Sequence, residues 1–367
     1  MASNCPDSLS PFPDKLCSTC SILNLNAEYF IVHPKDRKTG ISAATTTLGT
    51  VAELHGKSHC PFCRLVISSL GGSELPTIED GQPAYVMMKW GHTQTIIDSN
   101  QSEIDQVYVR NIFTYAATLA GSRRNRHVRP KEGYINPRIS VLAEDLPVSS
   151  KALLPRLIKE KVDMDMVRTW ISMCKEQHGP GCDLSENFTY ESENPAQQIP
   201  SFRLVDVVEN RIVRAPTDCK YLTLSYVWGR VEVLKTVKAN IHLLEQPGSL
   251  SSPQFAAKIP RTIRDAMEVT KLLKFRYLWV DSLCIIQDDD TGSKAEAIAK
   301  MDLVYGACFL TIIATGPHAD AGIEGVLSNP RGSRQIFEEV SPGLTLVAES
   351  SKYNYMKDSV YSTRAWT

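Results

Sequence analysis

Three short apolar runs in the C-terminal half of the chain predict the strands of a parallel sheet. They cover residues 221–228, 277–280 and 309–314, and each is rich in aromatic and β-branched residues. Continuous apolar runs of this length suit strands that are covered on both faces. Segments with helical periodicity separate the runs. The pattern therefore predicts a β-α-β-α-β unit with parallel strands and right-handed crossovers.

The two segments between these runs have the apolar spacing of amphipathic helices. The first is expected to begin at Ile259-Pro260, because proline in a first turn gives up a donor that would have no partner there. Its apolar stripe consists of Ile263, Ala266, Met267, Thr270 and Leu273. The stripe of the second helix consists of Ala295, Ile298, Met301, Val304 and Tyr305.

The rest of the chain is less regular. Possible strands cover 86–90 and 106–110, a helix is predicted within 162–182, a hairpin at 202–213 and a further strand at 344–347. A polar stretch rich in Asn, Gln and Glu reads as an exposed linker. The expected organisation is a Cys-rich module at 1–75, a mixed α+β region at 76–184, the linker at 185–200 and an α/β domain at 201–367.

Composition adds few constraints. Basic and acidic side chains number 40 and 41, so the chain has almost no net charge and no general attraction for nucleic acid or membrane. The N-terminus lacks a signal-peptide pattern, and no run approaches the roughly 20 apolar residues that span a bilayer. We therefore expect a cytoplasmic protein. In a reducing compartment, its ten cysteines are better explained as metal ligands or buried thiols than as disulfides.

Two Cys-x-x-Cys pairs near the N-terminus predict a metal site. They are Cys17 with Cys20 and, after an intervening 39 residues, Cys60 with Cys63. Two thiolates at this spacing can converge on one ion, and four complete the closed shell of a structural zinc site. The alternative is that these are reduced cysteines packed around a helix at 61–70. We favour zinc, because two Cys-x-x-Cys pairs (here called knuckles) indicate a metal site more strongly than other cysteine patterns do.

A second group of possible metal ligands follows in the middle of the chain. Cys174, His178 and Cys182 have the spacing of one helix face, and Cys219 is a conceivable fourth ligand. However, Gly-Pro-Gly at 179–181 should end the helix before Cys182. Packed thiols beside a hydrogen-bonded histidine are therefore the preferred interpretation.

A basic cluster at 123–131 could suggest contacts with phosphate groups. It is short, lacks aromatic residues for stacking and is offset by acidic residues elsewhere, so a solvated loop explains it better. Nucleic-acid binding is therefore not favoured.

Candidate ligand-binding residues follow the ends of the predicted parallel strands, because open α/β sheets bind ligands beyond the carboxyl ends of their strands. The chain has no glycine-rich phosphate loop. Trp228 and Trp279 are better explained as core residues that cover the sheet, but an acid such as Asp281 after an apolar strand must be solvated, paired or functional. Cys284 has no histidine nearby in sequence and is not favoured as a nucleophile. The predicted polar rim contains Ser225, Tyr226, Trp228, Gly229, Arg230, Asp281, Ser282 and residues 315–318.

These residues carry a resemblance to a known family. Leu-Ser-Tyr-Val-Trp-Gly at 224–229, Ile-Pro-Arg-Thr-Ile at 259–263, a long motif at 277–289 that begins Tyr-Leu-Trp-Val-Asp-Ser, and Arg-Ala-Trp-Thr at 364–367 occur in that order. Together they resemble the HET (heterokaryon incompatibility) domain of filamentous fungi, over roughly the C-terminal 40% of the chain.

The resemblance implies a sheet similar to the flavodoxin-like Toll/interleukin-1 receptor (TIR) fold, whose members either nucleate signalling assemblies or cleave NAD with a glutamate. It also adds Arg364 and Trp366 to the expected ligand-binding residues. The family motif places the corresponding glutamate three residues beyond Thr367, so we expect the chain as given not to hydrolyse NAD. Asp281 and Glu296 are the remaining catalytic candidates, although the helical spacing of Glu296 points it towards water.

The resemblance implies a fungal self/non-self recognition protein whose HET domain triggers programmed cell death, by NAD cleavage in an intact form. The main alternative is a non-enzymatic TIR-like assembly module, and a zinc-dependent nucleic-acid binder is a third. The expected partners are proteins of an incompatibility system, with self-association and without a membrane.

Overall fold

The computed structural model covers the 367-residue chain and divides it into two compact units. The first unit comprises residues 1–158 and 334–354, and the second comprises 159–333 and 355–367. The structure describes residues 14–32, 45–71, 83–94, 108–118, 126–128, 137–146, 154–178, 194–199, 201–332, 335–349 and 359–360.

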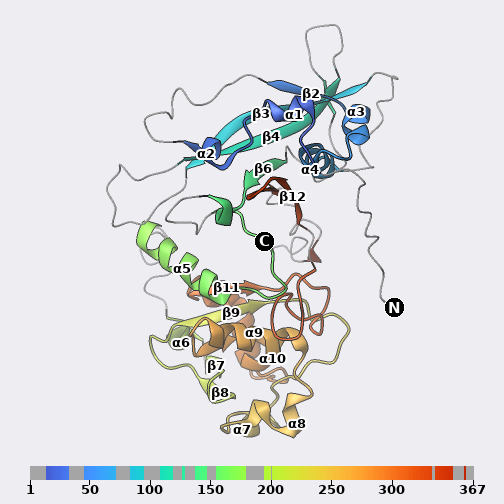
Figure 1. Cartoon of the computed structure of the whole chain (residues 1–367). Helices are drawn as coiled ribbons and strands as arrows, with labels where there is room; N and C mark the ends of the chain where they lie inside the picture. Colours follow the sequence, from blue (N-terminus) through green and yellow to red (C-terminus); the bar gives the residue numbers. More distant parts are fainter. Residues whose placement is uncertain are drawn as a thin grey trace. The chain divides into compact units, whose positions relative to one another are not determined.

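The first unit is built on an antiparallel sheet (Figure 1). The described strands follow the order β12-β13-β6-β4-β3-β2, and β1 and β5 also pair with β4. Alternate residues of β3, such as Val86 and Met88, are buried, as expected for a sheet with one face on a core. The strands are β1 (Ile31–Val32), β2 (Thr46–Thr50), β3 (Ala84–Gln94), β4 (Tyr108–Thr118), β5 (Arg126–Val128), β6 (Arg138–Val141), β12 (Ile336–Ser341) and β13 (Leu344–Glu349).

Short helices accompany this sheet. The helix predicted at 61–70 is confirmed as α4 (Pro61–Ser69), with proline in its first turn and Phe62 and Leu65 in the core of the unit. Thr50 and Glu53 form a capping box at the start of α3. The remaining helices of the unit are α1 (Ser18–Ser21), α2 (Ala27–Phe30), α3 (Val51–Gly56) and the short 3-10 helix η4 (Ala143–Asp145).

A late segment of the chain belongs to this first unit. Strand β13 pairs with β6, with Leu346 opposite Val141, and β12 forms a hairpin with β13. The sequence analysis predicted a strand at 344–347, which is confirmed, but assigned it to the domain beginning at residue 201. The chain therefore passes from the second unit into the first near residue 334.

The second unit contains a five-stranded mixed sheet in the order β11-β9-β10-β7-β8. The predicted parallel arrangement is confirmed for β9, β10 and β11, because β9 pairs in parallel with both of the others. The predicted hairpin is β7-β8, which adds two antiparallel strands beside β10, so the sheet is not wholly parallel. The bounds are β7 (Arg203–Asp206), β8 (Arg211–Arg214), β9 (Tyr221–Ser225), β10 (Tyr277–Trp279) and β11 (Leu310–Ile313).

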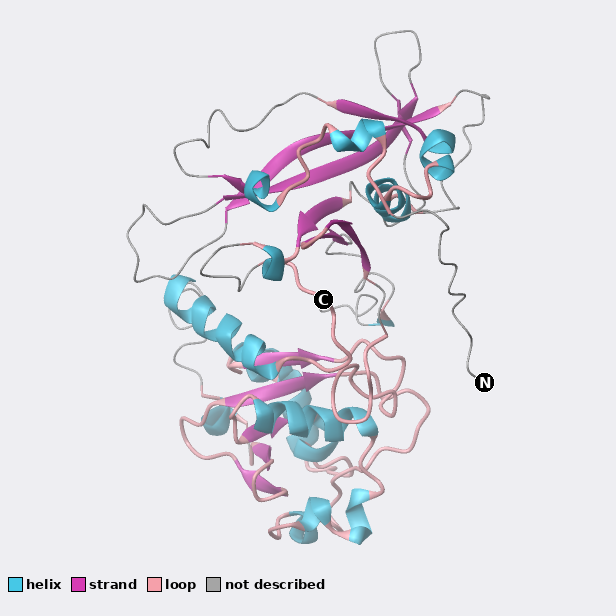
Figure 2. Cartoon of the chain, in the orientation of Figure 1, coloured by secondary structure: helices cyan, strands magenta, loops and turns pink. Residues whose placement is uncertain are grey.

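Helices accompany the strands of this unit, as Figure 2 shows. The first predicted crossover helix is α9, which begins one residue after Pro260. The second is divided in two at Lys300, whose backbone leaves helical geometry with φ −106° and ψ 21°. The helices are α5 (Met164–His178), α6 (Pro195–Gln198), α7 (Ile241–Leu244), η7 (Ser249–Ser251), α8 (Pro253–Ala256), α9 (Arg261–Leu272), α10 (Asp281–Cys284), α11 (Ser293–Ala299) and α12 (Met301–Gly306).

The core of the second unit lies around the parallel strands. Trp279 is 2% exposed and packs against Tyr305 with a ring-centroid distance of 5.6 Å, so it is a core residue. Leu222, Leu278 and Ile263 are also fully buried. None of the helices in the described part of the chain is long and apolar enough to cross a membrane.

The ion pair between the buried Asp206 of β7 and the half-exposed Arg276 gives the second unit an expected pH dependence. Asp206 is 1% exposed and accepts hydrogen bonds from Arg276 at 2.7 and 2.9 Å and from the backbone N–H groups of Val208 and Glu209. Burial raises the pKa of Asp206, but these hydrogen bonds outweigh burial and leave the pKa below its ordinary value of 3.8. Folding therefore favours the carboxylate, and this stabilisation is present above pH 3.8 and is lost as the pH falls through the folded-state pKa.

We expect Asp206→Asn to lower the free energy of unfolding near pH 7 by about 1–3 kcal/mol, because Arg276 loses its main acceptor. The stability of the variant should fall less than that of the wild type below about pH 4. Urea unfolding between pH 3 and pH 7 measures both effects. Glu296→Gln is the control, since this exposed carboxylate pairs only across one helical turn with Lys300 among the described residues. Equal pH slopes for Asp206→Asn and wild type would contradict the assignment.

Candidate functional site

The four knuckle cysteines come together in the first unit. Cys17 precedes α1 and Cys60 precedes α4, and Cys20 and Cys63 lie within these helices. All four side chains are buried, and their Sγ atoms lie within 4.8 Å of one another. The predicted convergence of the two Cys-x-x-Cys pairs is therefore present in the structure, and the group could hold a metal ion.

Two of the sulfur separations match those of a tetrahedral shell. The Sγ atom of Cys63 lies 3.8 Å from that of Cys17 and 3.6 Å from that of Cys20. Four thiolates at about 2.3 Å from one Zn²⁺ would be separated by about 3.8 Å, whereas a disulfide requires about 2.05 Å. Hydrogen bonds with the Cys60 and Cys63 thiols, and then burial, raise the pKa of Cys20. A divalent cation would remove this obstacle to deprotonation.

Arg64, the residue after Cys63, connects the segments that carry the two knuckles. Its guanidinium donates to Asp14, which lies just before the first knuckle, and to the carbonyl oxygen of Ser58, just before the second. It also donates two hydrogen bonds of 2.8 Å to Glu338 of β12. The late hairpin is thus attached to the helix that begins at the cysteine group.

The other predicted metal and phosphate sites lie mainly outside the described residues. Cys174 is half-buried on α5, but Cys182 and the side chain of His178 are not described. The side chains of the basic cluster at 123–131 are likewise not described. Arg364 and Trp366 also lie outside the described residues.

A polar cluster, which we call the strand-end cluster, lies at the carboxyl ends of β9 and β10 and contains Tyr226, Trp228, Asp281 and Ser282. Trp228 Nε1 donates to Asp281 Oδ2 at 2.9 Å, and Tyr226 donates its hydroxyl hydrogen to Ser282 Oγ at 3.1 Å. The other oxygen of Asp281 accepts the backbone N–H of Ser282 at 2.6 Å. Because β9 and β10 are parallel neighbours, their carboxyl ends meet at one edge, and four residues of the predicted polar rim lie in contact there.

The loop that follows β11 packs against the residues that follow β9. Gly229 has φ +69°, and a Cβ at this position would lie 2.5 Å from Cβ of His318, so the approach requires glycine. The backbone N–H of Ala319 donates to the carbonyl oxygen of Trp228 at 3.2 Å. His318 Nδ1 is buried and has no hydrogen-bond partner among the described residues. The loop after β11 therefore belongs to the same strand-end cluster.

The charges of the strand-end cluster are close to aromatic groups. Lys235 Nζ lies 5.2 Å from the ring centroid of Trp228, on the ring face. Burial, and secondarily the charge of Asp281, raises the pKa of Tyr226, so its phenol stays protonated and serves as a donor. Gln287, which the sequence did not single out, donates from Nε2 to the carbonyl oxygen of Asp281 at 3.1 Å and fixes the turn after β10.

The remaining candidates lie apart from these contacts or within the core. Ser225 is buried in β9, opposite Ile313 of β11. Glu296 is exposed and forms an ion pair of 3.1 Å with Lys300. Cys284 is buried, and burial raises its pKa to about 12, so at neutral pH it is a thiol and a poor nucleophile.

Comparison with known proteins identifies the stretch that contains the strand-end cluster. Residues 221–367 match the model of the family described as Heterokaryon incompatibility protein (HET). No curated protein and no solved structure matches the chain. The match begins at the first residue of β9 and includes all three parallel strands, their carboxyl ends and the late hairpin. Residues 221–367 of this chain are therefore a HET domain.

Proposed function

We propose that this protein acts in fungal self/non-self recognition and that its HET domain triggers incompatibility-type programmed cell death. The observation that carries the proposal is the family match over residues 221–367. The strand-end cluster around Asp281 is the proposed working site, because open α/β sheets bind ligands beyond the carboxyl ends of their strands.

The proposed ligand of this site is NAD, and the reaction that we propose for an intact form of the protein is cleavage of the bond between the nicotinamide and the ribose. The strand order β10-β9-β11 supports this assignment, because it corresponds to the 2-1-3 part of a flavodoxin-like sheet, the arrangement implied by the TIR resemblance. Trp228 offers an aromatic face and Asp281 a carboxylate, the kind of group that stabilises an oxocarbenium-like state.

The alternative is a non-enzymatic module that signals by assembly with itself or with protein partners. The hydrogen bonds of the cluster favour this alternative, because both oxygens of Asp281 already accept hydrogen bonds. The other acidic candidate, Glu296, is paired with Lys300 in solvent.

One experiment separates these proposals. The full chain is expressed from an inducible promoter in a filamentous fungus, and cell viability and cellular NAD are followed together, with nicotinamide release measured on the purified protein. Cell death with loss of NAD supports the enzyme, and cell death at constant NAD supports the assembly module. Unimpaired growth at high expression would contradict both.

We further propose that the four-cysteine group holds a structural Zn²⁺. The supporting observations are four buried sulfur atoms within 4.8 Å of one another and sulfur separations that fit tetrahedral coordination. Cys17, Cys20, Cys60 and Cys63 would be its ligands. The ion would join the two knuckles and stabilise the first unit, with no part in the chemistry of the HET domain.

A further inference from the structure

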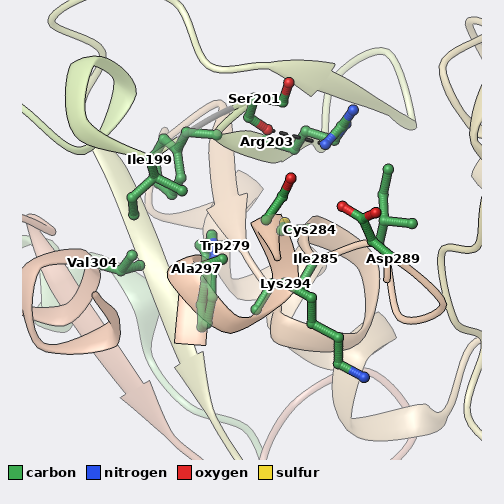
Figure 3. A pocket seen from close by; sticks show the side chains of 13 residues that line it. Ile199, Ser201, Arg203, Trp279, Cys284, Ile285, Asp289, Lys294, Ala297 and Val304 are labelled. Atoms are coloured by element: carbon green, nitrogen blue, oxygen red, sulfur yellow. Dashed lines mark hydrogen bonds between the residues drawn. The ribbon is translucent and has the colours of Figure 1, made fainter. Parts of the chain in front are cut away.

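A cavity of about 80 Å³ lies beside the carboxyl end of β10, in the second unit. One water needs about 10–15 Å³ by this measure, so the cavity has room for a ligand of several atoms. Figure 3 shows apolar Ile199 and Val304 on one side of it and charged Arg203, Asp289 and Lys294 on the other. The cavity lining does not include Trp228 or Asp281 of the strand-end cluster.

Arg203 brings a poorly compensated charge to this cavity. Its side chain is only 11% exposed, and its Nε is buried without a hydrogen-bond partner among the described residues. The guanidinium donates to the carbonyl oxygen of Ser201 at 3.1 Å. Its ion-pair partner Glu245 lies at 3.7 Å, beyond hydrogen-bond distance, and is itself 39% exposed. Buried charges in proteins are normally paired and hydrogen-bonded, so the cation has unused binding capacity.

The hairpin increases this positive charge. Arg203 of β7 stands directly opposite Arg214 of β8 in the antiparallel register. Like charges in this position repel each other, and the pair is destabilising without a counter-charge. Burial lowers the pKa of Arg203 below its ordinary value; the charge of Glu245 opposes this shift, and the charge of Arg214 adds to it.

The other charged side chains do not neutralise Arg203. Asp289 accepts hydrogen bonds from the N–H and hydroxyl groups of Thr291 and pairs with Lys238 at 3.5 Å. Lys294 Nζ donates to the carbonyl oxygen of Gln287 at 2.8 Å and forms no ion pair among the residues that the structure describes. The charged side of the cavity therefore carries an excess of positive charge.

We propose that this cavity binds a small ligand with one oxyanion group, a phosphate or a short-chain carboxylate. Arg203 binds the oxyanion through its free donor capacity, and Lys294 contributes the second positive charge. Any apolar part of the ligand lies against Ile199 and Val304. A planar guanidinium suits both oxyanions, because its N–H groups can donate in pairs to two oxygens. The inference is independent of the proposed function of the strand-end cluster.

The test measures binding of inorganic phosphate and of butanoate to the full chain, by calorimetry and by the shift in Tm, with chloride at equal ionic strength as the control salt. We expect at least one of the two oxyanions to bind and to raise Tm, and chloride to do neither. Arg203→Gln should abolish this response, and Lys294→Gln should weaken the affinity about tenfold, the loss expected for one ionic hydrogen bond. Arg264→Gln, which removes an exposed arginine of α9, should bind like the wild type.

A purely structural role for Arg203 predicts a different result. If the arginine served only to pair with Glu245, Arg203→Gln would lower Tm and leave the oxyanion response unchanged, which would overturn the proposal. Should Arg203→Gln not fold, Arg203→Lys keeps the positive charge but lacks the paired donors and is expected to bind more weakly than wild type. The absence of oxyanion binding to the wild type, or equal binding to wild type, Arg203→Lys and Lys294→Gln, would likewise overturn the proposal.

Discussion

Cys60→Ser is expected to release the metal and unfold the first unit, the largest loss of stability that we expect from a single substitution. Protein purified without chelator should contain about one Zn²⁺ per chain at the four-cysteine group. Structural zinc in small modules contributes about 10–16 kcal/mol to folding, which is comparable to the whole stability of a domain. The first unit should therefore lose its cooperative thermal transition, and metal analysis should find the protein free of zinc.

The matched control is Cys219→Ser, which removes a half-buried thiol of the second unit that lies outside the four-cysteine group. This variant should keep its zinc and both transitions. A chelator of high affinity should reproduce the effect of Cys60→Ser on wild-type protein. Metal-free wild type that melts at the same temperature as the purified protein would show that the thiols are only packed together.

The convergence of the four cysteines was predictable because the necessary information is local. Two thiols separated by two residues already face the same point, and Pro61 marks the start of the helix that carries Cys63. The parallel strands were predictable for a similar reason, since continuous apolar runs alternate with amphipathic segments. The strand-end cluster followed from the general position of ligands in such sheets, and the structure brings Trp228 and Asp281 to 2.9 Å.

The parts that sequence reasoning missed depend on partners distant in the chain. Strand β13 was predicted, but its pairing with β6 joins Leu346 to Val141, and no pattern within either segment specifies this partner. Arg203 lies at the start of an edge hairpin and looks like a solvated residue. Its side chain is only 11% exposed, and it lines a cavity together with Ile199 and with Lys294, which lies about 90 residues later in the chain. Burial of this kind depends on tertiary packing, so the local sequence around Arg203 does not predict it.

Asp281→Asn is expected to abolish cell-death signalling while leaving the protein folded. The amide oxygen can still accept the hydrogen bond from Trp228 Nε1, so the contact of 2.9 Å can be kept. The substitution removes the negative charge at the carboxyl end of β10, and it also replaces the oxygen that accepts the backbone N–H of Ser282 by an NH2 group. If this charge acts on a ligand or a partner, signalling should be lost completely, whereas Tm should fall only slightly, by the cost of the one lost hydrogen bond. The measurement is viability after induced expression, with thermal melting of the purified variant.

Asp281→Ala and Trp228→Phe separate this role from simple support of the fold. Asp281→Ala leaves the half-buried Trp228 N–H without its acceptor and should cost about 1–3 kcal/mol of stability, whereas Trp228→Phe removes the donor itself and should cost less. A structural role predicts that Asp281→Asn signals normally and that the three variants lose activity in proportion to their loss of stability. A role for the charge predicts that Asp281→Asn is the most stable of the three and still inactive. Because the asparagine side chain has nearly the shape of aspartate, packing alone cannot produce that second pattern.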